Sequence, residues 1–589
     1  MEKQEITARA RRYISLESDA GFRGEVEALL AQEDWKELED RFYRTLEFGT
    51  GGLRGVIGGG DNRMNTLVVK NATQGLASYL LRALPEKAAA GALSAAIAYD
   101  SRRYSKEFAE AAALIFAGNG IKAYLFSGMR PTPVLSFAIR ALGCDTGIVV
   151  TASHNPPQYN GYKAYWAGGG QVIPPHDEGI IAEVNRVTSV HTLTRDEALE
   201  RGLLVYIDKE IDGPYQAMVK RRLFRPALVR EQAASLPIVY TPLHGTGAPQ
   251  VEAILGGLGF KVTTVPEQRE GDGAFPTVSY PNPEEAAALE MAITLGKKTG
   301  ALLVMATDPD ADRFGAAVPA RDGAGFTLIT GNQMGTLLAD YLFLSLKETG
   351  TMPERPAMVN TIVTTGMQAA VAASYGVECF ECLTGFKWIA DLMRRAEADG
   401  SATIIFGDEE SYGYLVENEV RDKDGVSAAA LVAEMALYWR SQGKSLLDRL
   451  DDLYRAHGYW EETGVSKYFP GPEGPRTMAA IMEAYRAAPP AALGGIAVTK
   501  VRDILRSVTL FPGTPGKTEP IALPKSDVLQ FCLADGTVVS ARPSGTEPKI
   551  KFYASCRTEV GPGGLAEARA EAGRKLKAIK DDIIKVIGK

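Results

Sequence analysis

A short apolar segment that runs directly into a loop of glycine, proline and polar residues recurs along this chain. The segments are 147–150, 238–240, 302–305 and 403–406. Apolar runs this short are typical of strands that are buried on both faces, as in layered α/β sheets. In such sheets, ligands bind beyond the carboxyl ends of the strands. The pattern therefore predicts several similar α/β units, each of which contributes a loop to one shared cleft.

The length of 589 residues corresponds to about four domains of ordinary size. The end of the chain departs from the repeated pattern, because 567–587 reads as an Ala-, Lys- and Glu-rich helix that follows strand-like segments near 538–539 and 549–553. We therefore predict an α/β fold with three similar units and a smaller C-terminal α+β domain. The expected domains are 1–212, 213–324, 325–460 and 461–589.

Composition argues against several classes of protein. A hydrophobic content of 45% and a charged content of 23% are ordinary for a globular chain. The net charge is −7 and the basic residues are dispersed, so no nucleic-acid partner is expected. No apolar run approaches the roughly 18 residues of a membrane span, and residues 1–5 lack the apolar core of a signal peptide. We expect a cytoplasmic protein with no membrane partner.

Cysteine spacing carries no functional signal. Cys379 and Cys382 have the spacing of redox or zinc motifs, but a zinc site needs a second pair of this kind. The other cysteines, Cys144, Cys532 and Cys556, do not provide one. We predict reduced cysteines without a catalytic or metal role.

Ser153 and His154 place a hydroxyl beside an imidazole directly after the apolar segment 147–150. Two prolines follow, and proline has no amide hydrogen and restricts φ. We therefore expect Pro156 and Pro157 to end the strand in a rigid, extended turn. A serine here either caps the next element or presents its oxygen beyond the sheet, and the local sequence leaves both possibilities open.

Asp308, Asp310 and Asp312 occupy alternate positions after the segment 302–305. Alternate side chains of an extended segment share one side, so three hard oxygen ligands can converge on one cation. An EF-hand is excluded because Arg313 stands where its glycine is required and Pro319 where its glutamate is required. The alternative is a solvated acidic turn, but a buried strand that leads into the loop favours an open carboxylate site for Mg²⁺.

A second loop has the composition of a phosphate site. Arginine offers a planar fork to two phosphate oxygens, and hydroxyls and backbone amides near a glycine add donors. These residues are Arg542, Ser544, Gly545 and Thr546. Arg54, within the glycine-rich segment 49–55, forms a similar combination. Neither segment is a Walker loop, which would end in Gly-Lys-Ser/Thr, and both also fit plain turns.

Glu409 and Ser411 lie between Gly407 and Gly413 in a fourth loop. A carboxylate and a hydroxyl that point the same way suit two neighbouring hydroxyls of a sugar. A helix start, with the glutamate in its first turn, is the alternative interpretation.

Together these loops resemble the α-D-phosphohexomutase family over nearly the whole chain. In the order of the family, they are similar to its phosphoserine loop at Ser153, metal loop at 308–313, sugar-binding loop at 407–413 and phosphate loop at 542–546. The resemblance implies four domains around a central cleft, three α/β and one smaller C-terminal α+β. The sugar loop looks most like that of phosphoglucomutases, including the phosphopentomutase-like branch.

The resemblance implies that Ser153 carries a phosphoryl group in the resting enzyme. Asp308, Asp310, Asp312 and one phosphoryl oxygen would then hold Mg²⁺, which neutralises charge during transfer. Ser153 would pass its phosphoryl group to O6 of glucose 1-phosphate. The product would be glucose 1,6-bisphosphate, which turns over in the site before glucose 6-phosphate leaves.

The resemblance also implies roles for the flanking residues. Arg54 and Lys163 would stabilise phosphoryl oxygens or move the proton of the substrate hydroxyl, and His154 would orient the loop or be structural. Glu409 and Ser411 would bind the ring hydroxyls in both orientations. The distal phosphate would be held by Arg542, Ser544, Gly545 and Thr546, and Lys387 would read either the orientation of the substrate or the distal phosphate.

Two positions depart from the family pattern. Pro309 follows Asp308 where many members have glycine, which an extended loop accommodates. Asp408 adds a negative charge to the sugar loop, where we expect an effect on substrate preference and none on the chemistry.

Other functions remain open at this point. The same chemistry fits a phosphomannomutase, a phosphopentomutase or a sugar-bisphosphate synthase, although Ser411 favours a hexose. A phosphatase has little use for a second phosphate loop at 542–546, and a silent sugar-phosphate sensor has no need of Ser153. The expected partners are small-molecule sugar phosphates, and the expected state is a monomer or a homodimer.

Overall fold

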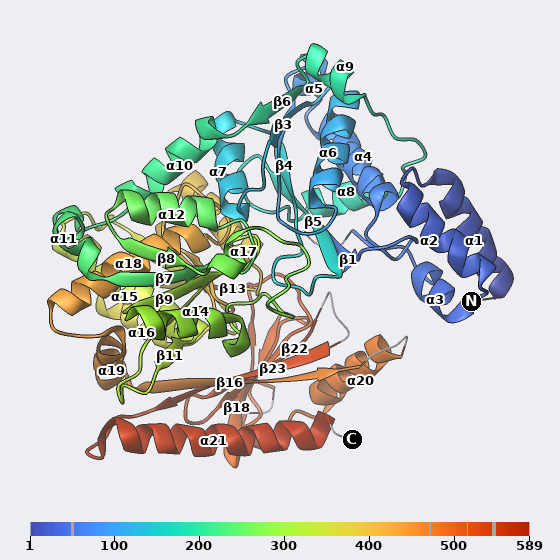
Figure 1. Ribbon diagram of the computed structural model, residues 1–589. Helices are drawn as coiled ribbons and strands as arrows, with labels where there is room; N and C mark the ends of the chain where they lie inside the picture. The colour runs from blue at the N-terminus through green and yellow to red at the C-terminus, as the bar shows by residue number, and fades with distance from the viewer. Residues whose placement is uncertain (1, 49–51, 470–472, 515, 545–548, 588–589) are drawn as a thin grey trace.

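Three layered α/β units and a C-terminal sheet-rich domain make up the chain (Figure 1). The structure is a computed structural model, and it describes residues 2–48, 52–469, 473–514, 516–544 and 549–587. The predicted fold class is confirmed. In the described part of the chain, no helix is both long and apolar enough to cross a membrane.

An N-terminal group of three helices precedes the first unit and was not predicted. They are α1 (Lys3–Leu16), α2 (Ala20–Ala31) and α3 (Trp35–Phe42). Their shared core contains Tyr13, Val26 and Leu38. The side chains of Asp19 and Asp34 accept backbone N–H groups at the starts of α2 and α3, which satisfies helix donors that would otherwise lack partners. In Figure 1 the group lies to one side of the first unit, next to α4 and β1.

The first unit is a mixed sheet in the order β1-β5-β4-β2-β3-β6. Its strands are β1 (Gly52–Val56), β2 (Ser94–Tyr99), β3 (Lys122–Phe126), β4 (Thr146–Val150), β5 (Tyr159–Trp166) and β6 (Leu204–Ile207). Its helices are α4 (Thr66–Ala83), α5 (Pro85–Ala89), α6 (Ser105–Gly118), α7 (Thr132–Leu142), α8 (His176–Val184) and α9 (Arg195–Glu200). Every residue of β4 is buried, as its apolar sequence predicted.

The second unit has the strand order β11-β10-β9-β7-β8. Its strands are β7 (Pro237–Thr241), β8 (Lys261–Thr264), β9 (Leu303–Thr307), β10 (Phe314–Pro319) and β11 (Phe326–Ile329). Its helices are α10 (Lys209–Arg221), α11 (Pro226–Gln232), the short 3-10 turn η1 (Ala233–Ser235), α12 (Ala248–Gly257), α13 (Pro266–Arg269) and α14 (Ala286–Thr299).

The third unit has the strand order β13-β12-β14-β15. Its strands are β12 (Pro356–Thr361), β13 (Glu378–Cys382), β14 (Thr403–Glu409) and β15 (Gly413–Leu415). Its helices are α15 (Gly331–Glu348), α16 (Met367–Ser374), α17 (Phe386–Asp399), α18 (Gly425–Ser441) and α19 (Leu446–His457). Because α18 is buried along most of its length and packs against both β9 and α15, the second and third units share one core.

The C-terminal domain is an antiparallel sheet with the long helix α21 (Gly564–Ile587) lying along it in Figure 1. Its other elements are β16 (Tyr459–Tyr468), α20 (Gly474–Ala487), β17 (Ala492–Leu493), β18 (Ile496–Asp503), β19 (Val508–Leu510), β20 (Thr518–Pro520), β21 (Leu529–Leu533), β22 (Val538–Pro543) and β23 (Lys549–Thr558). The boundaries expected after 212 and 460 fall inside α10 and β16, and the four-domain division remains a prediction.

Candidate active site

Ser153 lies in the tight loop that joins β4 to β5. Its backbone has a left-handed φ of 51°, and its amide donates a hydrogen bond to Thr151 Oγ1 at 2.8 Å. β4 ends at Val150, well before the prolines. The expected extended turn at Pro156 and Pro157 is therefore wrong in position, because the chain already turns sharply at Ser153.

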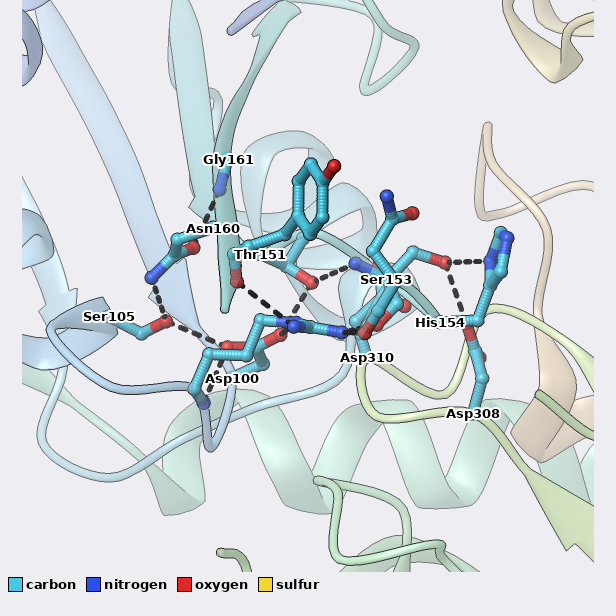
Figure 2. Close-up of polar contacts among 12 residues, drawn as sticks. Asp100, Ser105, Thr151, Ser153, His154, Asn160, Gly161, Asp308 and Asp310 are labelled. Atoms are coloured by element: carbon cyan, nitrogen blue, oxygen red, sulfur yellow. Dashed lines mark hydrogen bonds and ion pairs between the residues drawn. The ribbon is translucent and has the colours of Figure 1, made fainter. Parts of the chain in front are cut away.

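The Ser153 hydroxyl points at the metal loop (Figure 2). Its Oγ donates to Asp308 Oδ2 at 2.7 Å and lies 3.1 Å from His154 Nδ1. Burial, and then the nearby Arg313 and Arg54 charges, hold the pKa of His154 well below its usual value. The imidazole is therefore neutral at physiological pH and suited to orient the hydroxyl.

Asp308, Asp310 and Asp312 converge as a buried carboxylate triad, with one oxygen from each within 4.8 Å of the others. The geometry differs from the extended segment that we expected, because Ala311 adopts a φ of 51° and the loop turns. One oxygen of Asp310 and one of Asp312 are buried without a hydrogen-bond partner among the described residues. Buried carboxylate oxygens of this kind fit a hard divalent cation, so the triad is able to hold a metal.

Two lysines balance the charge of this triad. Lys163 Nζ, from β5, lies 2.7 Å from Asp310 Oδ2 and 3.2 Å from Asp312 Oδ2, and Lys423 Nζ lies 3.0 Å from Asp312 Oδ2. Burial lowers the pKa of Lys163, but the two aspartates outweigh it and the net pKa is raised. Burial raises the pKa of Asp310, yet Lys163 outweighs this effect and the net pKa is lowered. The pair is therefore held in its charged form.

A cationic cavity of about 170 Å³ opens beside Ser153. It draws residues from the first, second and C-terminal parts of the chain, and four of them are basic. The lining consists of Arg54, His154, Asn155, Arg313, Arg542, Pro543, Ser544 and Lys551. Arg54 Nη1 also donates to Asn155 Oδ1 at 3.2 Å, which ties it to the Ser153 loop. The cavity has the charge and size for a phosphate group.

The predicted phosphate loop is only partly visible. Arg542 and Ser544 line the cavity, whereas Gly545 and Thr546 lie outside the described residues.

The sugar loop lies where β14 ends. Glu409 is the last residue of that strand and accepts the Gly385 amide at 2.7 Å, so this loop contacts the segment that leads to Lys387. Ser411 is half-buried in the following turn. Burial lowers the pKa of Lys387, in the first turn of α17, although Asp177 opposes the shift.

The expected effect of Asp408 on substrate preference is not supported. Its side chain is fully buried and accepts a hydrogen bond from Gln368. Burial raises the pKa of this carboxyl well above its usual value. This carboxyl lies buried inside the unit and presents no exposed side chain to the cleft.

Several residues of the site were missed by the sequence interpretation. Arg313 and Lys551 line the cationic cavity. Lys423 contacts the triad at Asp312, and Thr132 Oγ1 donates to Asp310 Oδ2 at 2.8 Å. Arg102 donates to the backbone of the Ser153 loop. Arg313 stood inside a motif that was already recognised. The others lie on elements whose local sequence carries no sign of the site.

We expect Gly245→Ala to weaken cation binding, because a Cβ at this position would lie 2.3 Å from the Pro309 Cα in the metal loop. The added carbon must displace that backbone, and a displaced supporting residue typically costs about tenfold or more in metal affinity. The measurement is the divalent-cation dependence of thermal unfolding. Gly256→Ala is the matched control, since its Cβ would meet nothing within 4 Å. An unchanged cation dependence in Gly245→Ala would contradict the prediction.

Comparison with known proteins places this chain in a family. Three segments match its profiles: phosphoglucomutase/phosphomannomutase α/β/α domain I at 45–191, domain II at 214–323 and domain III at 330–457.

The curated relatives carry more than one name. "Probable phosphoribomutase" of Schizosaccharomyces pombe is 35% identical to this chain, and the match covers 97% of this chain and 96% of that protein. The phosphopentomutase of Homo sapiens is 34% identical over 94% of this chain and 92% of its own length. The phosphoglucomutase of Staphylococcus saprophyticus is 35% identical over 89% and 93%, respectively.

A solved structure shares the fold. The open form of Paramecium parafusin, described as a phosphoglucomutase, superposes with a TM-score of 0.68 at 17% sequence identity. The match covers 93% of this chain and 95% of that chain.

Proposed function

The chain belongs to the phosphoglucomutase/phosphomannomutase family of sugar-phosphate isomerases, and we propose that it is a phosphoglucomutase that interconverts glucose 1-phosphate and glucose 6-phosphate. The observation that carries the chemistry is the Ser153 hydroxyl, 2.7 Å from Asp308 at the edge of a buried carboxylate triad. The cationic cavity beside Ser153 supports a substrate that carries a second phosphate.

Ser153 is the phosphoryl carrier in this proposal. Its phosphoryl group passes to O6 of glucose 1-phosphate, so the Ser153 O–P bond breaks, the O6–P bond forms and the O6 proton ends on the Ser153 oxygen, which becomes a hydroxyl again. The resulting glucose 1,6-bisphosphate turns over and returns its O1 phosphoryl group to Ser153. Mg²⁺ bound by Asp308, Asp310 and Asp312 would supply charge neutralisation at the transferred group.

The lysine and the histidine take different roles. Lys163 lies 2.7 Å from Asp310 Oδ2, and its aspartate neighbours raise its net pKa, so it contributes positive charge to the site. The neutral His154, 3.1 Å from Ser153 Oγ, orients the nucleophile. Arg54 and the cavity cations neutralise the oxygens of the phosphate groups.

Glu409 and Ser411 are the proposed partners of the ring hydroxyls, and Lys387 lies in the segment that Glu409 contacts. Arg542 and Ser544 hold the distal phosphate in this proposal, and Arg313 and Lys551, which line the same cavity, contribute further positive charge. In this proposal the same side chains bind the bisphosphate in both orientations, with the 3- and 4-hydroxyls exchanged and the other phosphate in the distal position.

A pentose phosphate is the second candidate substrate. It is favoured by the printed names of two relatives, a phosphoribomutase and a phosphopentomutase, at 35% and 34% identity. The phosphoryl chemistry is the same, because only the sugar between the two phosphate positions differs.

Phosphorus NMR of the purified protein tests the proposal. With Mg²⁺ and glucose 1-phosphate, we expect glucose 6-phosphate to form faster when catalytic glucose 1,6-bisphosphate is added. Ribose 1-phosphate in a parallel reaction ranks the two sugars by kcat/KM. Release of inorganic phosphate would mean a phosphatase, and no conversion of either sugar would overturn the proposal.

Ser411→Ala tests the choice of sugar. Losing one hydrogen bond to a neutral hydroxyl costs about 1 kcal/mol, so we expect kcat/KM for glucose 1-phosphate to fall about fivefold to tenfold, with a smaller change for ribose 1-phosphate. Ser189→Ala, at an exposed loop position, is the control. Equal losses for both sugars would show that Ser411 does not distinguish them.

A further inference from the structure

A buried arginine, Arg102, lies directly beneath the loop that carries Ser153. Its Nη2 donates to the backbone carbonyl of Ser153 at 2.6 Å and to that of Asn155. Its Nη1 donates to the carbonyls of Pro156 at 2.9 Å and Tyr159 at 3.0 Å. A single guanidinium therefore donates hydrogen bonds to four backbone carbonyls between the end of β4 and the start of β5.

Asp100 fixes this arginine from below. Its Oδ2 lies 3.4 Å from Arg102 Nε, and its carboxylate accepts the Arg102 amide at 2.9 Å, Ser105 Oγ at 2.7 Å and Thr151 Oγ1 at 2.6 Å. Thr151 Oγ1 in turn accepts the amide of Ser153 (Figure 2). Both ends of the Ser153 peptide unit are thus connected to one buried ion pair.

Residues of the second unit pack against Arg102 and the backbone next to it. The ring of Phe275 lies 4.9 Å from the Arg102 guanidinium carbon, and Phe275 is buried with a left-handed φ of 47°. A Cβ at Gly273 would lie 2.5 Å from the Arg103 nitrogen, so this segment packs closely on the backbone around Arg102. The unit that carries Asp308 therefore also covers the residue that holds the Ser153 loop.

Ser153 needs such support because its left-handed backbone costs a non-glycine residue about 1–2 kcal/mol. We propose that Arg102, covered by Phe275, is the positioning residue that holds Ser153 against Asp308 and, through Asn155, aligns Arg54. This inference rests on the proposed phosphoserine mechanism. Lysine is no substitute, because a single ammonium has neither the planar fork nor the reach to bind four carbonyls.

The test is Arg102→Lys, with the exposed Arg103→Lys as the matched control. We expect kcat to fall about 10²-fold, since small misplacement of a reacting group has an effect of this size, while KM for glucose 1-phosphate changes much less. Hydrogen exchange of the amides in 151–161 is expected to accelerate in Arg102→Lys and not in Arg103→Lys. Unchanged exchange in that segment, or a loss confined to KM, would overturn the inference.

Phe275→Leu covers the case in which Arg102→Lys fails to fold. It keeps an apolar group over the guanidinium and removes the ring face, so we expect the same exchange signature with a smaller loss of kcat. Wild-type exchange in Phe275→Leu would contradict the role of the second unit. The exchange experiment also separates this inference from the proposed function. It reports on how Arg102 holds the Ser153 loop even if wild-type protein converts no sugar phosphate.

Discussion

Ser153→Ala is expected to reduce sugar-phosphate isomerisation by roughly 10⁵-fold, the scale seen when a catalytic nucleophile is removed. The substitution deletes the oxygen that lies 2.7 Å from Asp308 Oδ2 and 3.1 Å from His154 Nδ1. Alanine retains the loop's carbonyl bonds to Arg102, so the fold is expected to persist. Coupled assay of glucose 6-phosphate formation measures the loss.

Phosphoryl labelling sharpens this experiment. Wild-type protein incubated with labelled glucose 1,6-bisphosphate should retain label on the protein, and Ser153→Ala should retain none. Ser189→Ala serves again as the exposed control. Turnover in Ser153→Ala within about tenfold of wild type, a difference of only 1.4 kcal/mol, would rule out the phosphoserine route.

Asp310→Asn is expected to lower kcat about 10³-fold and to weaken Mg²⁺ binding. The change removes a negative charge that faces Lys163 at 2.7 Å and leaves Asp312 at 3.2 Å from the lysine. Charge stabilisation by a metal ion is worth several kcal/mol in phosphoryl transfer, which sets the expected size of the effect. The shape of the side chain and its contact with Thr132 are kept.

Two measurements test the loss at Asp310. Activity against Mg²⁺ concentration gives the apparent affinity, and thermal unfolding with and without Mg²⁺ reports binding independently of turnover. Asp322→Asn, in an exposed turn after β10, is the control for removal of one carboxylate charge. If Mg²⁺ raised the unfolding temperature of Asp310→Asn as much as that of wild type, Asp310 would not be a ligand.

The N-terminal helices illustrate a limit of sequence interpretation. The repeated apolar segments are locally distinctive, whereas α1–α3 bury short apolar faces against one another and, through Phe22 of α2, against the core of the first unit. Their contact with the first unit has no local signal in the sequence. The turn at Ser153 was misplaced for a related reason, since a left-handed serine is held by distant groups such as Arg102 and not by its own neighbours.

The amino-acid sequence by itself determined the strands and the chemistry of their loops. Short buried runs such as β4 and β9, and the oxygen-rich segment 308–312, are local properties, because composition sets both burial and ligand type. Only the tertiary structure decided which loops meet. Ser153 and Asp308 are 155 residues apart and lie in contact, and one cavity gathers Arg54, Arg313 and Lys551. Such contacts depend on how separate sheets pack, and that packing is a property of the whole core that no single segment encodes.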